Sequence, residues 1–275
     1  MSKVLSNAQI EGFRKDGYIA PLRAISTERA AEVRGRLEAY ERSTGGPLSG
    51  SLRGKPHLLF TWLNDLIREE RIIDAIEDLY GENLMCWSSS FFIKEPADSA
   101  FVSWHQDSTY WGLSSPDVVT AWVALSESNK ANGALEVVPG THLRDQIPHR
   151  DTFSKNNMLT RGQEVAVDVD PNSAVMLELE PGEMSLHHVR LIHGSAPNPS
   201  KTQRRIGLAI RYMPTSVRQL EGEDGASLVR GVDNFRTFEH EPIPARDMDP
   251  EFVELHRKQH ERAVKILYKG AKIPA

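Results

Sequence analysis

Apolar residues recur at helical spacing in the first third of the chain and again near its end. The spacing predicts helices over residues 6–16, 26–43 and 62–80, which are followed by Gly17, Gly45 and Gly81, and glycine commonly ends a helix. Ser26 is suited to cap the second of these helices. A fourth helix is predicted over about 250–268.

The middle of the chain has a different texture, with short segments rich in β-branched, aromatic and aliphatic residues. Turn formers such as Asn132-Gly133, Pro139-Gly140 and Pro181-Gly182 separate these segments. Eight strands are predicted, over residues 84–94, 101–106, 117–125, 134–139, 164–168, 173–178, 183–188 and 205–212. Short strands at this spacing favour a sandwich or barrel of the jelly-roll type. The predicted fold class is therefore mainly β with flanking helices (α+β).

No linker, repeat or low-complexity segment divides the chain, so we expect one domain over residues 1–275. Its parts would be a helical region of about 1–82, a β core of about 84–213, and a C-terminal region over 214–275 that ends in a helix. The polar segments 141–163 and 214–248 are long enough to act as lids over a site.

Composition narrows the partners of the chain. It carries 33 Lys+Arg against 38 Asp+Glu, a net charge of −5, with no basic tract, so nucleic acid is not expected to bind. No segment approaches the roughly 20 apolar residues of a membrane helix, and the N-terminus lacks the apolar core of a secretion signal. The single cysteine, Cys86, has apolar neighbours and is expected to be buried in a protein of a reducing compartment. We therefore expect a cytoplasmic protein that acts on a small molecule; the sequence does not indicate its oligomeric state.

The candidate chemistry begins at Trp104-His105-Gln106-Asp107. Residues i and i+2 of a strand point to the same face, so His105 and Asp107 would project together while Gln106 points away. His193 follows 88 residues after His105, at the edge of an apolar stretch and before an expected turn at Gly194. Two imidazoles and one carboxylate form the facial ligand set of non-haem ferrous sites. A lone His-x-Asp is a common coincidence, but its order with a β region, His-Gly-Ser and arginine makes coincidence a poor explanation.

These residues resemble the phytanoyl-CoA dioxygenase-like family of Fe(II)/2-oxoglutarate oxygenases. The resemblance runs from Gln9 to about Tyr212 and rests on four motifs: Trp104 to Asp107, Thr120 to Leu125, Asn132 to His142 and His193 to Asn198. It implies a double-stranded β-helix in which His105, Asp107 and His193 bind iron, with 2-oxoglutarate and O2 as cosubstrates.

The resemblance also implies which residues hold 2-oxoglutarate. Arg204 would pair with its 5-carboxylate, because the family's arginine falls eleven residues after the distal histidine, and Trp122 and Ser195 would line the same pocket. Arginine suits this role, because its planar fork meets a carboxylate through two charge-assisted hydrogen bonds. On a regular strand, Arg205 would then point away, toward the surface, and Arg211 would face away as well.

The stretch from Glu183 to His193 and the stretch from Arg204 to Tyr212 look close to a chlorinating branch of the family. Those enzymes replace the metal-binding carboxylate with alanine or glycine, whereas Asp107 is present here. We therefore expect hydroxylation, with succinate and CO2 as coproducts. The alternatives are desaturation, cyclisation or epimerisation by the same kind of oxygenase, and a catalytically silent jelly-roll protein that only binds a small molecule.

Aromatic and polar residues beside the metal motifs are candidates for contact with the substrate, although the aromatic ones could equally fill the barrel. They are Trp87, Ser89, Phe91, Tyr110, Trp111, His188 and Arg190. Arg190, Arg211 and Arg218 favour a substrate with an anionic group. Lys94 is expected at the surface, and His256 and His260 on an exposed helix face. His187 and His188 are expected to form hydrogen bonds rather than to bind metal.

Overall fold

Seven strands form the larger of two facing sheets in the structure, a computed structural model that describes residues 2–271. The neighbouring strands are antiparallel except for β12 and β13, which run parallel. In spatial order the strands are β1 (Tyr18–Arg23), β9 (Glu183–His188), β4 (Val119–Ala124), β11 (Arg205–Pro214), β2 (Leu84–Lys94), β12 (Gly225–Arg230) and β13 (Glu239–His240).

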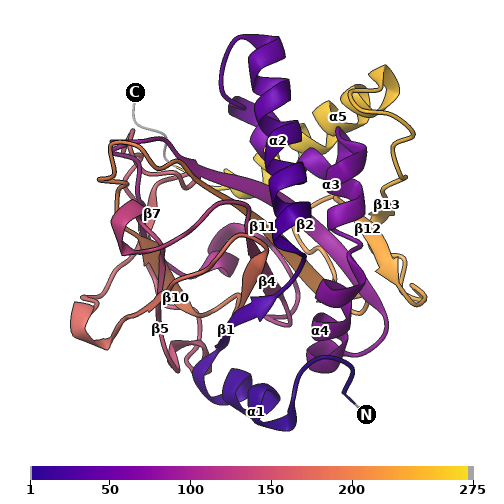
Figure 1. The fold of residues 1–275 in the computed structure, drawn as a ribbon. Helices are drawn as coiled ribbons and strands as arrows, with labels where there is room; N and C mark the ends of the chain where they lie inside the picture. The colour runs from indigo at the N-terminus through magenta and orange to yellow at the C-terminus, as the bar shows by residue number, and fades with distance from the viewer. Residues whose placement is uncertain (1, 272–275) are drawn as a thin grey trace.

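The second sheet has four antiparallel strands, and a two-stranded ribbon lies beside it. Figure 1 shows this side of the molecule, with β5, β7 and β10, opposite the side that carries α3 and α4. The sheet order is β3 (Val102–His105), β10 (Ile192–Ser195), β5 (Leu135–Val138) and β8 (Val175–Leu177), and the ribbon pairs β6 (His149–Asp151) with β7 (Gln163–Val165). The predicted class, a mainly β jelly roll with flanking helices, is confirmed.

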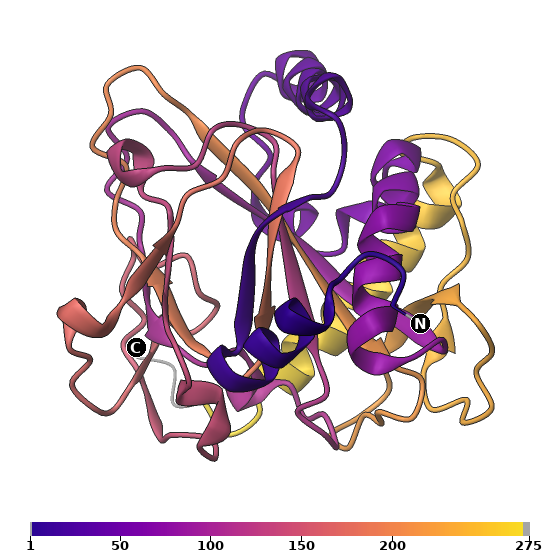
Figure 2. The same ribbon diagram turned by 60° about the horizontal axis from the view of Figure 1, so that its bottom comes forward.

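Helices cover the outer face of the larger sheet, as the view turned by 60° also shows (Figure 2). They are α1 (Asn7–Asp16), α2 (Thr27–Thr44), α3 (Thr61–Leu66) and α4 (Glu70–Tyr80), whereas α5 (Pro250–Leu267) lies near the inner-face residues Trp87 and Arg211. Ser6 and Ser26 cap α1 and α2 through their side-chain oxygens, and Gly17 and Gly45 end these helices in the left-handed conformation. No described helix is long and apolar enough to cross a membrane.

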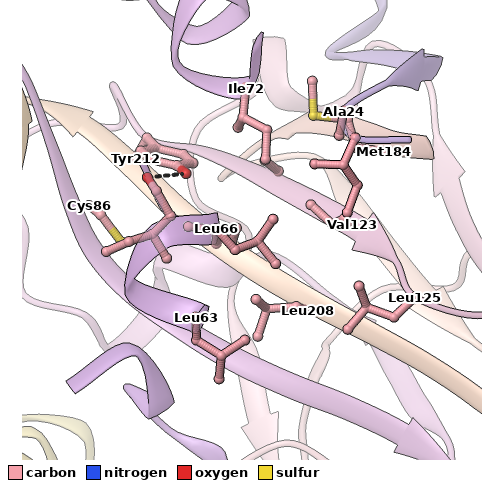
Figure 3. Packing of buried hydrophobic residues seen from close by; sticks show 14 of the residues in the cluster. Ala24, Leu63, Leu66, Ile72, Cys86, Val123, Leu125, Met184, Leu208 and Tyr212 are labelled. Atoms are coloured by element: carbon pink, nitrogen blue, oxygen red, sulfur yellow. Dashed lines mark hydrogen bonds between the residues drawn. The ribbon is translucent and has the colours of Figure 1, made fainter. Parts of the chain in front are cut away.

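Alternation along β11 decides which side chains face the helices and which face the second sheet. Ile206, Leu208, Ile210 and Tyr212 are fully buried in the cluster shared with α2, α3 and α4, and Figure 3 shows Leu208 and Tyr212 among Leu63, Leu66 and Ile72. Because successive side chains of a strand point to opposite faces, Arg205, Gly207, Ala209 and Arg211 point into the space between the sheets. The apolar face of one strand thus fixes which polar groups line the interior.

The predicted helix over 62–80 is two helices, α3 and α4, separated by residues 67–69. The hydroxyl of Tyr212 donates a hydrogen bond of 2.9 Å to the carbonyl oxygen of Ile67, an acceptor that a continuous helix would offer to residue 71 (Figure 3). A tertiary contact from β11 therefore accompanies the break, and the periodicity of the segment gives no sign of it.

Several strands lie outside the segments predicted to be extended. β1 belongs to the predicted helical region, and β12 and β13 belong to the predicted C-terminal region, yet all three extend the larger sheet. β10 was also missed, because Gly194 was expected in a turn and instead lies within this four-residue strand. A Cβ at Gly194 would lie 3.0 Å from the carbonyl oxygen of Val102, which explains why β3 and β10 approach closely there.

Gly207 is expected to be intolerant of any side chain. A Cβ at this position would lie 1.9 Å from Cζ2 of Trp122, so Gly207→Ala must displace the indole or the strand. Overpacking of this kind costs about 1–3 kcal/mol. We expect the free energy of unfolding in urea to fall by about that amount.

Gly35→Ala is the matched control, because Gly35 is an exposed residue within α2 with nothing within 4 Å of an added Cβ. This substitution should raise the free energy of unfolding by up to about 1 kcal/mol. Equal effects of the two substitutions would contradict the close packing of Trp122 on β11.

Candidate metal centre and the cavities beside it

Three buried side chains converge between the two sheets: His105 at the end of β3, Asp107 just after it, and His193 on β10. Their candidate ligand atoms all lie within 4.8 Å of one another. Oδ1 of Asp107 is 3.3 Å from Nε2 of His105 and 3.9 Å from Nε2 of His193. Two imidazoles and one carboxylate at these distances can share a single metal ion.

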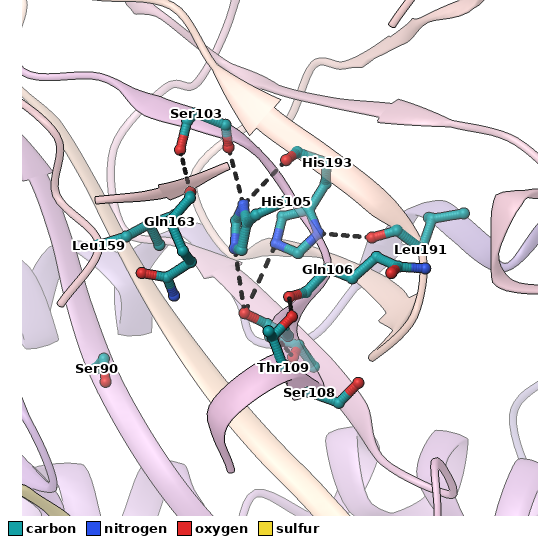
Figure 4. Close-up of polar contacts among 12 residues, drawn as sticks. Ser90, Ser103, His105, Gln106, Ser108, Thr109, Leu159, Gln163, Leu191 and His193 are labelled. Atoms are coloured by element: carbon teal, nitrogen blue, oxygen red, sulfur yellow. Dashed lines mark hydrogen bonds and ion pairs between the residues drawn. The ribbon is translucent and has the colours of Figure 1, made fainter. Parts of the chain in front are cut away.

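Backbone carbonyl groups orient both imidazoles (Figure 4). Nδ1 of His105 lies 2.9 Å from the carbonyl oxygen of Ser103 and 3.1 Å from that of His193, and Nδ1 of His193 lies 2.9 Å from that of Leu191. Because a carbonyl oxygen only accepts, each Nδ1 carries the proton, and each Nε2 presents a lone pair toward Asp107. Burial also holds the pKa of His193 well below its usual value, so this imidazole is neutral. The side chains therefore fit a divalent metal ion without rearrangement.

The chain leaves the strand between the first two ligands. β3 ends at His105, and Asp107 is the first residue of a short 3-10 helix, η3 (Asp107–Tyr110). The backbone N–H of Asp107 donates to the carbonyl oxygen of Val189 over 2.9 Å, which fixes this turn. Gln106 points away, as predicted, and its amide hydrogen-bonds the backbone of Ile147 and Arg190.

Asp107 is ionised despite its burial. Burial opposes ionisation, but the guanidinium of Arg211 outweighs it and holds the pKa of Asp107 well below its usual range. Nε of Arg211 lies 3.8 Å from Oδ2 of Asp107, and the hydroxyl of Thr120 donates to the same oxygen over 3.4 Å. The carboxylate is thus available to a metal at neutral pH.

A small cavity of about 20 Å³ extends from the metal ligands to the buried guanidinium of Arg205, which is 2% exposed. Among the described residues, Nε of Arg205 has no hydrogen-bond partner. Trp122 and Ser195, both predicted to line a cosubstrate pocket, do line this cavity, and the Arg205 guanidinium carbon lies 5.4 Å from the Trp122 ring. Its remaining walls are formed by Phe92, Val102, His105, Asp107, Thr120, Leu135, His187, His193, Ala209 and Arg211.

Arg204, the residue predicted to bind the cosubstrate carboxylate, points the other way. It forms two hydrogen bonds of 2.8 Å with Glu41 of α2 and one of 2.8 Å with Glu95, and it does not line the cavity. The prediction was wrong because counting residues from His193 across the loop between the two strands cannot show which residues of β11 face the interior. The apolar even-numbered residues of β11 pack on the helices, so Arg204 points toward the helices and Arg205 points inward.

The same parity error affected Arg205 and Arg211. Arg205 was expected at the surface and Arg211 was expected to face away, but both line the cavity beside the metal ligands. Lys94 was also expected at the surface, whereas it is fully buried opposite Arg205 in the β2–β11 register. Its Nζ donates to Oγ of Ser195 over 2.7 Å, and burial together with Arg205 lowers the pKa of Lys94 to about 6.

A second, larger cavity of about 320 Å³ opens from the metal site toward α5. It shares Phe92, Asp107 and Arg211 with the smaller cavity, so the two cavities meet at the metal ligand Asp107. Three of the seven predicted substrate residues line it: Trp87, Phe91 and Trp111. The rings of Trp87 and Trp111 lie 4.7 Å apart and form one wall.

The other four predicted substrate residues lie elsewhere. A bulge at Trp87 shifts the β2 register, so Ser88 and Ser90 face the cavity while Ser89 turns to the helices, where its Oγ lies 2.7 Å from Nδ1 of His57. Tyr110, His188 and Arg190 do not line the cavity: their side chains contact Asp151, His142 and Asp145, respectively. Proximity in sequence to a metal ligand was not enough to place these side chains.

The C-terminal helix supplies a wall that the sequence did not predict. His256 and His260 line the cavity together with Gln259, and His256 is buried, with Nε2 2.8 Å from the carbonyl oxygen of Gly54. The expectation of an exposed histidine face was therefore wrong for His256. The only available signal was the row of small and apolar residues, Ala263, Val264 and Ile266, on the same helix.

Arg161 fastens the end of α5 to the segment that carries Asp107. Its guanidinium donates to the carbonyl oxygens of Leu267 over 2.6 Å and Lys269 over 2.9 Å, and it stacks 3.8 Å from the centre of the Tyr110 ring. The carboxylate of Asp151 accepts hydrogen bonds from both Arg161 and Tyr110. The predicted lid segment 141–163 thus holds the C-terminal helix in place across the larger cavity.

Comparisons with known proteins agree with this geometry. Residues 2–206 match the model of the phytanoyl-CoA dioxygenase (PhyH) family, and the chain belongs to that family. A protein of Stutzerimonas stutzeri named "Probable alpha-ketoglutarate-dependent hypophosphite dioxygenase" is 34% identical over 169 residues, 61% of this chain and 58% of that protein. The chain spans about half the length of the curated relatives it matches.

Solved structures cover more of the chain. The apo form of the non-heme monooxygenase ThoJ has a TM-score of 0.85 at 31% identity and covers 95% of this chain and 98% of its own. CytC3 with Fe(II) and alpha-ketoglutarate has a TM-score of 0.65 at 25% identity, covering 89% of this chain and 98% of its own. The resemblance inferred from the sequence is confirmed, and Fe(II) and 2-oxoglutarate are the metal and cosubstrate that accompany this fold and family.

Loss of any one ligand should weaken metal binding sharply. We expect His193→Ala and Asp107→Ala to weaken the binding of Co(II), an oxygen-stable probe, by at least about 100-fold, because even residues that only orient ligands are worth 10- to 100-fold. Isothermal titration of the apo protein measures this. His240→Gln, at an exposed histidine paired with Asp233, should leave Co(II) affinity unchanged. Wild-type affinity in either ligand variant would contradict the assignment.

Proposed function

We propose that this protein is an Fe(II)- and 2-oxoglutarate-dependent dioxygenase that hydroxylates an unactivated C–H bond of a small or medium-sized polar metabolite. One observation carries the proposal: the buried His105, Asp107 and His193 cluster lies between a smaller cavity that ends at Arg205 and a larger cavity that extends toward α5. A cosubstrate and a substrate can thus reach one metal ion from two sides.

The polar lining of the smaller cavity supports a dicarboxylic 2-oxo acid as the cosubstrate. Arg205 is assigned to the distal carboxylate, because a guanidinium binds a carboxylate through two parallel hydrogen bonds and Nε of Arg205 lacks a partner among the described residues. Burial lowers the pKa of Arg205 to about 10, so it remains charged at neutral pH. Ser195 and Trp122 shape the walls, and His105, Asp107 and His193 are assigned to the metal.

The roles of the protein and the metal divide cleanly. Bound iron supplies the oxidation that couples the decarboxylation of 2-oxoglutarate, to succinate and CO2, with insertion of oxygen into the C–H bond. The protein holds the metal ligands in place and binds the cosubstrate carboxylate. Asp107 supplies the carboxylate ligand, so the place that a halide would take in the absence of this carboxylate is occupied. This favours transfer of a hydroxyl group.

The substrate is assigned to the larger cavity, with Trp87 and Trp111 as its contacts, whereas the Phe91 ring packs in the core shared with the helices. A cavity of about 320 Å³ is at the lower end of the size range of small-molecule sites, which supports a compact metabolite. The cytoplasmic location expected from the single cysteine remains a prediction. Cys86 is buried, and burial raises the pKa of its thiol, as expected for an unreactive residue.

Release of succinate across a panel of metabolites tests the proposed function. Anaerobic addition of Fe(II) and 2-oxoglutarate should first give a weak visible charge-transfer band, and admission of oxygen with a suitable metabolite should then give succinate and a product heavier by one oxygen. A product that has lost two hydrogens, or an isomer, would indicate desaturation, cyclisation or epimerisation. The absence of both the band and succinate would indicate a protein that only binds its ligand.

Arg205 and Arg204 are adjacent and should behave oppositely. Arg205→Gln should weaken 2-oxoglutarate binding by about 30-fold or more, since truncating one partner of a buried ionic hydrogen-bonded pair costs about 2–5 kcal/mol. Arg204→Gln should leave this affinity unchanged and lower thermal stability, because it removes the contacts with Glu41 and Glu95. Titration of the Co(II)-loaded protein with 2-oxoglutarate measures the affinity. The reverse pattern would restore Arg204 as the cosubstrate residue.

A further inference from the structure

We propose that the substrate carries an anionic group, a carboxylate or a phosphonate, that pairs with Arg211 where the two cavities meet. The inference rests on the proposed function and names its substrate class. It assigns to Arg211 the role of a specificity-determining residue for that reaction.

Arg211 is a buried cation with too few partners. The residue is 8% exposed, and one of its terminal nitrogens, Nη1, donates a hydrogen bond of 3.2 Å to Oγ of Ser90. Among the described residues, Nε has no hydrogen-bond partner. The nearest carboxylate, that of Asp107, lies 3.8 Å from Nε, which is beyond hydrogen-bond distance. A guanidinium with five donors therefore has unused hydrogen-bonding capacity inside the protein.

The charge of Asp107 is also needed elsewhere. When Asp107 binds a divalent metal, its carboxylate balances the metal and no longer fully balances Arg211. A buried charge is costly unless it is paired, so the loaded site favours another anion beside Arg211. The carboxylates of 2-oxoglutarate do not remove this need, because Arg205 adds positive charge of its own at the far end of the smaller cavity.

Arg211 is placed where a substrate can reach it. Arg211 lines both the larger cavity and the smaller cavity. Its guanidinium carbon lies 5.1 Å from the centre of the Trp111 ring. The other buried cation of the larger cavity, Lys55, is already paired with Glu241 at 2.6 Å and lies 3.6 Å from Asp224. Arg211 is therefore the cation that an incoming anion would meet beside the metal.

The surroundings of Arg211 also describe the rest of the substrate. Trp87 and Trp111 form one wall of the cavity, and Leu159 and Ile266 contribute further apolar surface. A compact apolar body attached to the anionic group would pack against these side chains. With the anion held at Arg211, a C–H bond of that body would lie near Asp107, on the substrate side of the metal.

Matched pairs of probes test the inference on the anaerobic protein loaded with Fe(II) and 2-oxoglutarate. Each pair consists of an anion and its neutral counterpart: phenylacetate with phenylacetamide, and phenylphosphonate with dimethyl phenylphosphonate. Binding is followed by the change in the charge-transfer band and by quenching of tryptophan fluorescence. We expect the better anion to bind the wild-type protein at least about ten-fold more tightly than its neutral counterpart.

Arg211→Gln should abolish the preference for the anion, and Arg211→Lys should retain part of it. The control variants are Arg190→Gln and Arg218→Gln, because both arginines lie outside the cavity and should not affect the preference. The inference is overturned if no anion of the panel binds the wild-type protein, or if Arg211→Gln keeps the preference. It is also overturned if that variant loses metal or 2-oxoglutarate binding instead, which would make Arg211 a positioning residue for Asp107.

The two levels of the proposal fail differently. If the proposed function is wrong, the iron and 2-oxoglutarate band is missing before any probe is added. If only the inference about Arg211 is wrong, the band forms normally and the anionic and neutral probes bind alike.

Discussion

The apolar face of β11 is the constraint on which the site depends. Ile206, Leu208, Ile210 and Tyr212 are buried against the helices, and this burial fixes the orientation of every other residue of the strand. Slipping a strand by one residue would exchange its two faces, so the cost of exposing four large apolar side chains holds the register firmly. Arg205 and Arg211 reach the interior only because their neighbours must face the other way. The chemistry on one side of the sheet is thus maintained by hydrophobic packing on the other side.

The two histidine ligands lie on neighbouring strands, and the third ligand, Asp107, lies in the turn that follows β3. β3 and β10 are hydrogen-bonded neighbours, and His105 and His193 lie directly opposite each other in their register. Carbonyl groups of the same two strands, and of Leu191 just before β10, fix the proton on each Nδ1. The ligand geometry is therefore built largely from backbone hydrogen bonds of the smaller sheet, while Asp107 comes from a turn that begins where β3 ends. Rigid strands carry the two imidazoles, and the carboxylate is adjusted by the charge of Arg211 from the larger sheet.

The substrate side of the molecule is organised differently from the cosubstrate side. Apart from Ala209 and Arg211, the smaller cavity is lined by residues within the region that matches the family, whereas the larger cavity is completed by α5, which lies after the matched residues 2–206. Arg161 joins α5 to Tyr110 and thereby to the turn that carries Asp107. This arrangement separates the groups that hold metal and cosubstrate from a wall that can vary in sequence without disturbing them. It is consistent with a family in which a shared reaction centre serves unlike substrates.

The sequence by itself determined the class of fold, most helix and strand positions, and the three side chains that converge as a candidate metal site. These follow from local periodicity and from short motifs, and both are properties of neighbouring residues. Only the tertiary structure decided which arginine faces inward, that Lys94 is buried, and that α5 lines the larger cavity. Arg204 and Arg205 are both charged and adjacent, so nothing local distinguishes them; the distinction comes from Ile206 and Leu208 packing on helices more than a hundred residues away in the chain. In the same way, Ser88 rather than Ser89 faces the cavity because a bulge at Trp87 shifts the pairing of β2 with β11. Orientation depends on long-range pairing, and a pattern of single residues does not contain it.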